Sequence, residues 1–227
     1  MNFKPIFGFI AGAFLALNLN ASTIKKGELI VATEGTYSPY SFYDEKGELV
    51  GYDVDIAKAV AKKLNLKIEF LTAPWDAMLA AFDAGKADVV FNQVSINEDR
   101  KKKYDMSVPY TMPYPVIVVH KDNNDIKSFA DLKGKKSVHS ATSNWAAIAE
   151  KNGATVVVAD GFSKGVELII SKRADDTIND NVTFFDYIKQ RPNAPLKIAY
   201  TSNEPMPTAA LLKKGNTELL EAINKAL

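Results

Sequence analysis

An arginine that follows an apolar run is the residue of this sequence best suited to bind a small charged molecule. The segment Phe91–Tyr110 reads FNQVSINEDRKKKYDMSVPY, with Arg100 after a series of small polar residues. A guanidinium stays charged at physiological pH, and its planar donors can bind both oxygens of a carboxylate. Lys101, Lys102 and Lys103 follow directly, and a basic run of this kind is usually a solvent-exposed face. Arg100 alone therefore leaves a carboxylate site and a charged surface both open.

Small polar residues lie between the apolar run and the arginine. Asn92 and Gln93 come at the end of the predicted strand, and Ser95 follows two residues later. Backbone amides and carbonyls at a strand end need hydrogen-bond partners, which a ligand can supply. We expect a polar binding surface at this strand end.

Two other loops carry groups suited to binding. Glu34 and Tyr37 follow the first predicted strand in ATEGTYSPYSFYDEKG, a segment rich in glycine and aromatic residues. Ligands of open α/β sheets bind beyond the carboxyl ends of the strands, so both side chains are expected in a cleft. A ring in a loop serves binding more often than a ring in a core strand. Trp75 heads a predicted helix, where a core position and a site position are equally open.

The second half of the chain offers a helix start and an acidic strand end. Thr142 and Ser143, in HSATSNWAAIA, precede a predicted helix whose free amides attract a carboxylate, although ordinary N-capping explains the same residues. Asp180 ends the predicted strand DDTIND and either binds an ammonium group or caps the next helix. Asp175 and Asp176 open that strand and are expected to face solvent.

Composition excludes several classes of function. The formal net charge of +1 argues against nucleic acid and anionic membranes as partners. The chain has no cysteine, which rules out disulfides, a thiol nucleophile and a lipid-modified cysteine. With only two histidines, a multi-histidine metal site and a histidine-based triad are not expected. No metal and no cofactor are predicted.

The first residues have the pattern of a secretory signal peptide. Residues 1–21 combine an early lysine, an apolar run and a small residue, Ala21. Pro5, Gly8 and Gly12 interrupt the run, which is shorter than the ~20 apolar residues of a membrane-spanning helix. We expect export to the periplasm without a lipid anchor.

Two series of alternating strands and helices follow. The first is GELIVATE, DVDIAKAVAKKL, KIEFL, WDAMLAAFDAG and ADVVFNQ. The second includes PVIVVH, a short helical turn at SFADLKG, KKSVH, a helix at 144–151, TVVVAD, a helix at 164–171, DDTIND, a helix at 182–189 and LKIAYTS. Alternation of this kind predicts largely parallel sheets covered by helices on both faces.

Two series in one chain predict two lobes. We expect residues 24–110 together with 208–227 to form the first lobe and residues 115–203 to form the second. Residues 111–114 and 204–207, the latter containing Pro205 and Pro207, are expected to cross between the lobes as a two-strand hinge.

Four segments taken together resemble a known family. They are GTYSPYSFYDEKGELVGYDVDIAKAVAKKL, WDAMLAAFDAGKADVV, INEDRKKKYDMSVPY and KKGNTELLEAINKAL. They resemble the polar amino-acid branch of the periplasmic solute-binding proteins of ABC importers, solute-binding family 3. The segment NQVSINEDRKKKYDMSVPYT is most similar to members that bind cystine or related sulfur amino acids. The resemblance covers the mature chain and implies a two-lobed periplasmic-binding-protein-like fold (type II), each lobe a mixed, mostly parallel sheet flanked by helices.

The resemblance also implies how the main chain of an amino acid is held. Arg100 would bind the α-carboxylate, helped by the amide of Ser95 and the helix N-terminus at Ser143. Asp180 would bind the α-ammonium together with the Ser95 hydroxyl and the Gln93 carbonyl. A zwitterion would then find partners for both of its charges when the cleft closes.

The ligand side chain would meet a different set of residues. The rings of Tyr37 and Trp75 would enclose the ligand, and Glu34 with Asn92 would face its side chain. Cystine, cysteine, glutamine and basic amino acids all remain open as ligands. The partners implied are a free amino acid and the permease subunits of an ABC importer, with the protein itself a monomer.

The sequence departs from the family pattern in three places. The segment SATSNW replaces a glycine-rich loop, and DDTIND is a polar version of a strand that usually has a larger apolar face. The chain ends at Leu227, where family members continue through a further helical segment. A lower stability or an incomplete product is therefore one expectation.

Two other functions are compatible with the same scaffold. One is an amino-acid dehydratase or lyase, in which Glu34 would be the general acid with its pKa raised by a closed apolar site. The other is a ligand-sensing partner of a receptor. The binding protein is the prediction preferred to both.

Overall fold

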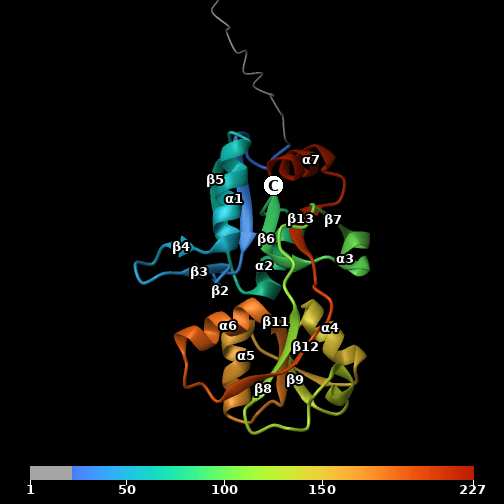
Figure 1. The fold of residues 1–227 in the computed structure, drawn as a ribbon. Coiled ribbons are helices and arrows are strands. Elements are labelled where there is room, and N and C mark those ends of the chain that lie inside the picture. Colours follow the sequence, from blue (N-terminus) through green and yellow to red (C-terminus); the bar gives the residue numbers. More distant parts are fainter. Residues whose placement is uncertain (1–21) are drawn as a thin grey trace, which may run out of the picture.

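The computed structural model describes residues 22–227, and the predicted signal peptide at 1–21 lies outside the described residues. Two five-stranded sheets, each flanked by helices, form two lobes (Figure 1). The predicted two-lobed α/β fold is confirmed. No helix within residues 22–227 is both long enough and apolar enough to cross a membrane.

The first sheet uses both ends of the described chain. Across the sheet its strands are β5 (Lys67–Thr72), β1 (Glu28–Thr33), β6 (Val89–Ser95), β13 (Thr208–Lys213) and β7 (Tyr104–Met106). β5, β1 and β6 are parallel, whereas β13 runs antiparallel to both β6 and β7. The helices of this lobe are α1 (Tyr52–Lys63), α2 (Trp75–Asp83), α3 (Glu98–Lys103) and α7 (Thr217–Ala226).

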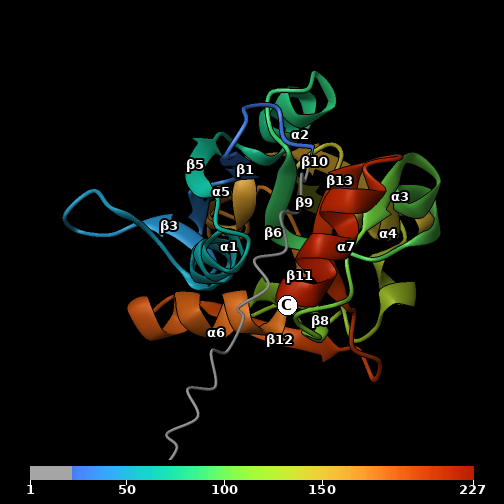
Figure 2. The same cartoon turned by 90° about the horizontal axis from the view of Figure 1, so that it is seen from above.

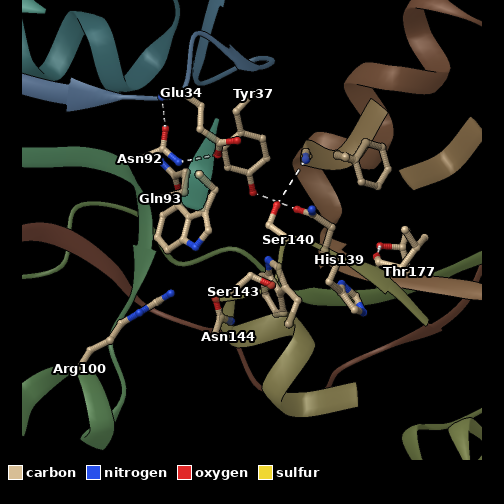
Figure 3. A pocket seen from close by; sticks show the side chains of 16 residues that line it. Glu34, Tyr37, Asn92, Gln93, Arg100, His139, Ser140, Ser143, Asn144 and Thr177 are labelled. Atoms are coloured by element: carbon tan, nitrogen blue, oxygen red, sulfur yellow. Dashed lines mark hydrogen bonds between the residues drawn. The ribbon is translucent and has the colours of Figure 1, made fainter. Parts of the chain in front are cut away.

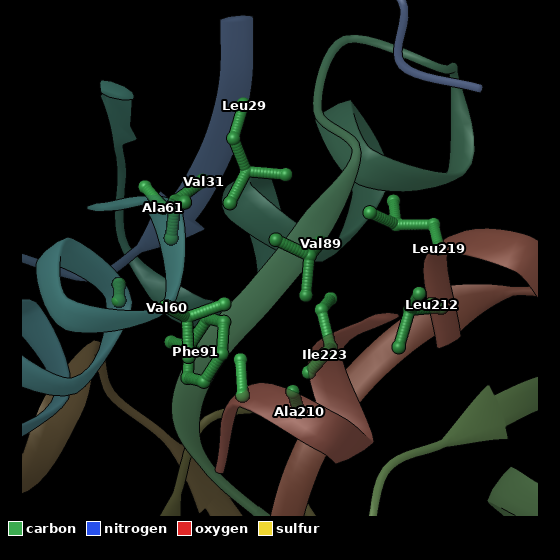
Figure 4. Close-up of a cluster of buried hydrophobic side chains, with 12 residues drawn as sticks. Leu29, Val31, Val60, Ala61, Val89, Phe91, Ala210, Leu212, Leu219 and Ile223 are labelled. Carbon is green, nitrogen blue, oxygen red and sulfur yellow. The ribbon is translucent and has the colours of Figure 1, made fainter. Parts of the chain in front are cut away.

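Helices cover both faces of this sheet. Successive side chains of a strand point to opposite faces, and in this sheet both sets are apolar and must be buried. Leu29 and Val31 of β1 point toward α1 and α7, in the core drawn in Figure 4. Ile30 and Ala32 of the same strand pack on the other face against α2. α2 is thereby held at the end of the sheet that faces the second lobe (Figure 1).

The second sheet has the same mixed character. Its strands are β10 (Thr155–Val158), β9 (Lys136–His139), β11 (Asp176–Asp180), β8 (Pro115–His120) and β12 (Leu196–Thr201). β10, β9 and β11 are parallel, and β8 is antiparallel to both β11 and β12. The 3₁₀ helix η1 (Phe129–Leu132) and α4 (Asn144–Lys151) cover one face, and α5 (Gly161–Ile170) and α6 (Asn181–Gln190) cover the other.

One helix begins earlier than the sequence pattern indicates. α5 starts at Gly161 rather than at Lys164. The reason is that its apolar face, Phe162, Val166 and Ile169, has the spacing of successive helical turns and is buried from the first turn onward. The early start brings the first turn of α5 to the ligand cavity described below.

A small sheet extends from the first lobe. β2 (Thr36–Tyr37), β3 (Ser41–Tyr43) and β4 (Leu49–Val50) form it, and Figure 2 shows it projecting beside α1. Gly51 closes it against α1 with φ 123°, and a Cβ atom there would lie 2.4 Å from the Tyr40 carbonyl oxygen. Only glycine fits this approach, which holds the loop carrying Tyr37 close to the first sheet.

Two chain segments cross between the lobes side by side. Thr208 N donates to Thr111 O at 3.0 Å, and Met206 N donates to Pro113 O at 2.7 Å. The Thr111 and Thr208 hydroxyls are also hydrogen bonded to each other. The segments predicted as a hinge are therefore joined as an antiparallel ribbon, while their movement stays a prediction.

Candidate ligand-binding site

A cavity lies where the two lobes meet, and residues of both lobes line it (Figure 3). The first lobe contributes residues that the sequence singled out: Glu34, Tyr37, Trp75, Asn92, Gln93 and Arg100. The second contributes Val138, His139, Ser140, Ser143, Asn144, Trp145, Gly161, Phe162, Thr177 and Asn179. Seven of the ten predicted site residues line this cavity, since Ser143 belongs to it and Ser95, Thr142 and Asp180 do not.

Arg100 is positioned by the start of α3. The Asn97 side chain caps this helix by accepting from Arg100 N at 2.8 Å, and Arg100 Nη1 donates to Ser95 O at 2.9 Å. The guanidinium also lies 5.3 Å from the centre of the Trp75 ring, within the range of a cation–π contact. Ser95 thus holds the arginine through its carbonyl. Its predicted direct contact with a ligand stays a prediction.

The charge of Arg100 has no counterion among residues 22–227. Within residues 22–227 no carboxylate lies within 4.0 Å of the guanidinium. Burial lowers its pKa to about 10, because the charged form loses hydration. A partly buried cation without a partner is costly, and a carboxylate in the cavity would relieve that cost.

The three lysines after Arg100 have the ordinary role that their run indicated. Lys101 and Lys102 pair with Glu98 and Asp99 of the same helix at 2.9 Å each, and Lys103 pairs with Asp83 at 2.7 Å. All three lysines are exposed. The basic run is therefore a solvated face of α3.

Glu34 brings a buried carboxyl group to the same cavity. Asn92 Nδ2 donates to its Oε2 at 2.7 Å, and Glu34 N donates to Asn92 Oδ1 at 2.8 Å. Burial raises the pKa of Glu34 to about 7, although the Asn92 hydrogen bond opposes that shift. Asn92 therefore orients Glu34 at the cavity wall. The carboxyl can be neutral or charged near physiological pH.

Asp180 is saturated with hydrogen bonds outside the cavity. Tyr37 OH lies 2.6 Å from its Oδ2, and Tyr40 OH donates to its Oδ1 at 2.9 Å. Thr183 donates to both oxygens, from N and Oγ1, at 2.8 Å, which makes Asp180 the N-cap of α6. A carboxylate has about four acceptor positions, so an ammonium could bind only if a tyrosine moved. Ammonium binding by Asp180 stays a prediction, and the capping alternative describes its present contacts.

Thr142 connects the two lobes. Its N and Oγ1 both donate to Asp76 Oδ1, at 2.9 and 2.5 Å, and Ala141 N donates to Asp76 Oδ2 at 3.0 Å. Trp75 Nε1 in turn donates to Thr142 Oγ1 at 3.0 Å. Trp75 therefore both lines the cavity and closes it. Asp76, which the sequence did not mark, accepts three hydrogen bonds from the opposite lobe.

Ser143 and Gln93 each have a structural task beside their place in the cavity wall. The Ser143 hydroxyl accepts from Ala146 N at 3.1 Å, which caps α4. Gln93 has φ 49°, a region that side chains rarely adopt. Its amide donates to Asp53 Oδ1 at 2.7 Å and accepts from Thr111 Oγ1 at 2.6 Å, so it ties β6 to a crossing segment.

The expectation that Asp176 faces solvent is wrong. Its side chain is fully buried, and Ser137 Oγ donates to its Oδ1 at 2.5 Å. The cause is the register of the sheet, in which β11 lies beside β9 with Asp176 opposite Ser137. Asp175 is half-buried, and its Oδ2 accepts from Lys136 N at 2.7 Å.

His139 and its neighbours in the second lobe were missed as cavity residues. They lie at the carboxyl ends of β9 and β11 and in the first turns of α4 and α5. The rule that ligands bind beyond strand ends could have indicated them. No group of three or more histidine or acidic side chains within residues 22–227 is arranged to hold a metal.

Comparison with known proteins identifies the family of this chain. Residues 29–227 match the family model of the bacterial extracellular solute-binding proteins, family 3, and the chain belongs to this family. It is 46% identical over 203 residues to the "Probable amino-acid ABC transporter-binding protein" of Haemophilus influenzae, covering 89% of this chain and 79% of that protein. It is 44% identical over 211 residues to the L-cystine-binding protein TcyA of Bacillus subtilis, covering 92% of this chain and 78% of the relative.

A solved structure gives the same result at the level of the fold. An ancestral arginine-binding protein bound to glutamine superposes with a TM-score of 0.83 and is 43% identical, covering 89% of this chain and 91% of that one. The relatives named here are transport-binding proteins or amino-acid-binding proteins.

Proposed function

We propose that this protein binds a free polar amino acid between its lobes in the periplasm and delivers it to the permease of an ABC importer. L-Cystine or a related amino acid is the favoured ligand, because of the similarity to TcyA. L-Arginine and L-glutamine are the next candidates, because of the similarity to the ancestral arginine-binding protein.

The uncompensated charge of Arg100 carries this proposal. The guanidinium lines the cavity, rests on Trp75 and has no carboxylate partner in the described chain. An α-carboxylate would complete it, and the raised pKa of Glu34, about 7, leaves a second group ready to meet a polar or cationic ligand side chain. The ten predicted site residues retain their proposed roles, Asp180 as the ammonium partner only after its tyrosines move.

Closure of the two lobes would couple ligand binding to transport. Hydrogen bonds from Tyr37, Tyr40 and Thr142 join the lobes in the arrangement described here. The crossing segments at 111–114 and 204–207 would act as the hinge between the predicted lobes. A ligand that binds the closed form better shifts the population toward it, and the permease would recognise that shape.

The test is binding by calorimetry to the purified protein and two variants. Thermal-shift screening of the twenty amino acids plus L-cystine identifies the ligand, which should raise the melting temperature and bind one to one. Arg100→Ala should weaken binding by about 2–5 kcal/mol, tens- to thousands-fold, because a buried carboxylate loses its partner. Lys102→Ala, at an exposed position two residues after Arg100 on α3, is the matched control. Unchanged affinity in Arg100→Ala would refute the assignment.

A second function is favoured by one observation, the pKa of about 7 for Glu34 in the cavity wall. Such a carboxyl group suits a general acid of an amino-acid dehydratase or lyase. We infer binding without turnover, since the similar proteins named above are binding proteins. Incubation of each stabilising amino acid with the protein, followed by chromatography, should return the ligand unchanged. Product formation that Glu34→Gln abolishes would establish the enzyme instead.

A further inference from the structure

Three buried polar side chains form a hydrogen-bonded chain inside the second lobe. His139 Nε2 lies 2.7 Å from Ser137 Oγ, which is 2.5 Å from Asp176 Oδ1. Ser137 and His139 are two residues apart on β9, so their side chains point to the same face. The parallel register places Asp176 of β11 directly opposite Ser137. All three residues are buried.

The hydrogen-bonded row Asp176–Ser137–His139 ends at the ligand cavity. His139 lines the cavity, and Figure 3 draws it on the side away from Arg100. Its second ring nitrogen, Nδ1, makes no hydrogen bond within the described part of the protein. At the other end, Asp176 Oδ2 is buried and has no hydrogen-bond partner among residues 22–227. Ser137 is therefore the only hydrogen-bonded link from Asp176 toward the cavity wall in the described chain.

The number of protons shared by Asp176, Ser137 and His139 determines which of two neutral tautomers the histidine adopts. Ser137 has one hydroxyl proton, so it donates to one neighbour and accepts from the other. With ionised Asp176, the hydroxyl donates to the carboxylate and accepts from Nε2–H, which leaves Nδ1 as an acceptor. With Asp176 protonated at Oδ1, the oxygen that faces Ser137, the carboxyl donates to the hydroxyl, which donates to Nε2. Nδ1 must then carry the ring proton and becomes a donor.

We propose that the protonation of Asp176 determines, through Ser137, whether His139 offers a hydrogen-bond acceptor or a donor to the ligand. Protonation of Asp176 adds one proton to the three side chains taken together. The ring stays neutral throughout, because it loses the proton at Nε2 and gains one at Nδ1 by exchange with water in the cavity. His139 is thereby a specificity-determining residue whose polarity is set by a residue that the ligand does not touch.

The burial of both end groups supports neutral forms in preference to an ion pair. Burial raises the pKa of Asp176 to about 7 and lowers the pKa of His139 to about 3. A carboxylate with one unpaired buried oxygen is costly, which favours protonation of Asp176. A buried imidazolium is equally disfavoured, so the added proton stays on Asp176.

Other ionisable groups near the chain are few. Asp175 and Lys135 act on Asp176 from the adjoining loops, and Glu34 and Arg100 face His139 across the cavity. β10 carries no ionisable side chain, and Asp180 follows on β11. The helices packed on β9 carry exposed Glu150, Lys151, Lys164 and Glu167. Burial raises the pKa of Glu34 to about 7, so Glu34 needs its own control.

A consequence for binding rests on the proposed function. A ligand group that accepts a hydrogen bond, such as a carbonyl or carboxylate, would stabilise the donor form and bind with uptake of a proton. An ammonium, guanidinium or amide N–H would stabilise the acceptor form and bind with release of one. The second-lobe wall would thus favour ligand groups that accept a hydrogen bond below the pH at which Asp176 ionises. Above that pH it would favour ligand groups that donate one.

The decisive experiment is nitrogen NMR of histidine-labelled protein without ligand. The described chain contains only His120 and His139, so the signals are assigned with one variant, His120→Gln. Over roughly pH 5.5–8.5, His139 should pass from the Nδ1–H form to the Nε2–H form without becoming an imidazolium. An imidazolium at His139, or a single tautomer across this range, would overturn the proposal.

Two variants locate the cause of the change. Asp176→Asn keeps the shape of the side chain but removes its titration, and Ser137→Ala removes the link. Each should hold His139 in one tautomer at every pH, while Glu34→Gln should leave the transition in place. If Asp176→Asn does not fold, Ser137→Ala tests the same step. A transition that persists in a folded variant of either kind would contradict the role of Asp176.

Calorimetry in buffers of different ionisation enthalpy connects the switch to binding. L-Cystine, L-arginine and L-glutamine are the probes, and proton exchange on binding should be reduced in Asp176→Asn relative to the parent, beyond any change seen in Glu34→Gln. Equal proton exchange in the parent and in Asp176→Asn would contradict the ligand coupling. A failure of all amino acids to bind would refute the proposed function, whereas the tautomer result would stand unaffected.

Discussion

The two walls of the cavity differ in charge. The wall from the first lobe carries Arg100 and Glu34, and neither side chain has an oppositely charged partner in the described chain. The wall from the second lobe is lined by apolar, hydroxyl and amide side chains and a neutral His139. Under the proposed function, charge recognition would therefore be concentrated on one lobe, while the other would supply shape and neutral hydrogen bonds.

The walls also differ in how their polar groups are satisfied. Ser143 is occupied by its cap of α4, and Ser140 Oγ accepts from Gly161 N at 3.3 Å. Arg100 uses only one of its donors within the structure, toward Ser95 O. The first wall thus gains most from a ligand, whereas the Ser140 and Ser143 hydroxyls of the second wall already have partners. A ligand should bind the first lobe before the second closes.

The largest expected effect is the loss of ligand affinity in Arg100→Ala. The next largest is the pH dependence of stability that Glu34 causes in the first-lobe wall. The pKa of Glu34 is about 7 in the folded protein against 4.5 for the free group. The folded protein thus holds this proton more tightly, and the resulting stabilisation, present below pH 4.5, is lost as the pH rises through 7. The difference amounts to about 3 kcal/mol, from about 2.5 pKa units at about 1.4 kcal/mol each.

Urea unfolding of the unliganded protein measures this effect. Glu34→Gln should be more stable than the parent by about 3 kcal/mol at pH 8 and nearly equal to it at pH 4, since glutamine keeps the shape without the charge. Glu45→Gln, at an exposed position, is the control. A Glu34→Gln effect that is the same at both pH values would show that the folded protein does not raise the pKa of this carboxyl.

The next test concerns the ligand side chain. At pH 8 Glu34 is ionised, so Glu34→Gln should weaken L-arginine binding by about 10- to 100-fold, or about 1.4–2.7 kcal/mol, while L-glutamine changes little. Competition of both amino acids against the identified ligand gives the ratio. If the ratio of arginine affinity to glutamine affinity is unchanged in Glu34→Gln, Glu34 does not recognise the ligand side chain. The first-lobe wall would then recognise charge through Arg100 alone.

A smaller effect is expected at the contact between the lobes. Asp76 accepts three hydrogen bonds from Ala141 and Thr142. Asp76→Ala should lower ligand affinity by about 5- to 30-fold, about 1–2 kcal/mol, because the closed form loses these bonds. Small-angle scattering should show a more open unliganded protein, whereas Asp55→Ala on the exposed face of α1 changes nothing. Full affinity in Asp76→Ala would mean that the ligand alone holds the lobes together.

The smallest effect is expected for Ser143, in the cavity wall of the second lobe. Ser143→Ala should reduce stability by about 1 kcal/mol through the lost cap of α4, and Ser143→Thr should restore it. The loss of affinity should not exceed about tenfold, since a neutral hydrogen bond contributes about 0.5–1.5 kcal/mol. Thermal unfolding and calorimetry separate the two quantities. A loss as great as that of Arg100→Ala would place the main carboxylate contact at the helix start instead.

Much of the fold was readable from local patterns. The strands and helices followed from apolar spacing, and α4 has the bounds that its pattern indicated. Arg100, Glu34 and Trp75 could be placed in one cavity because each follows a strand that ends at the same edge of the first sheet. Asp180 was found by the same rule and Thr142 by its place at a helix start, but their contacts with Tyr37 and Asp76 reach across the lobes and could not be derived from their own segments.

The sequence by itself determined the two series of strands and helices, because these depend on periodicity, and it singled out Glu34 and Arg100 by their positions after strand ends. Tertiary structure alone decided that Asp76 accepts from Thr142, that two tyrosines occupy Asp180, and that Asp176 is buried against Ser137. The physical reason is that pairing across strands and across lobes depends on register and closure. These are set by the packing of the whole chain, and no local pattern of polar residues specifies them.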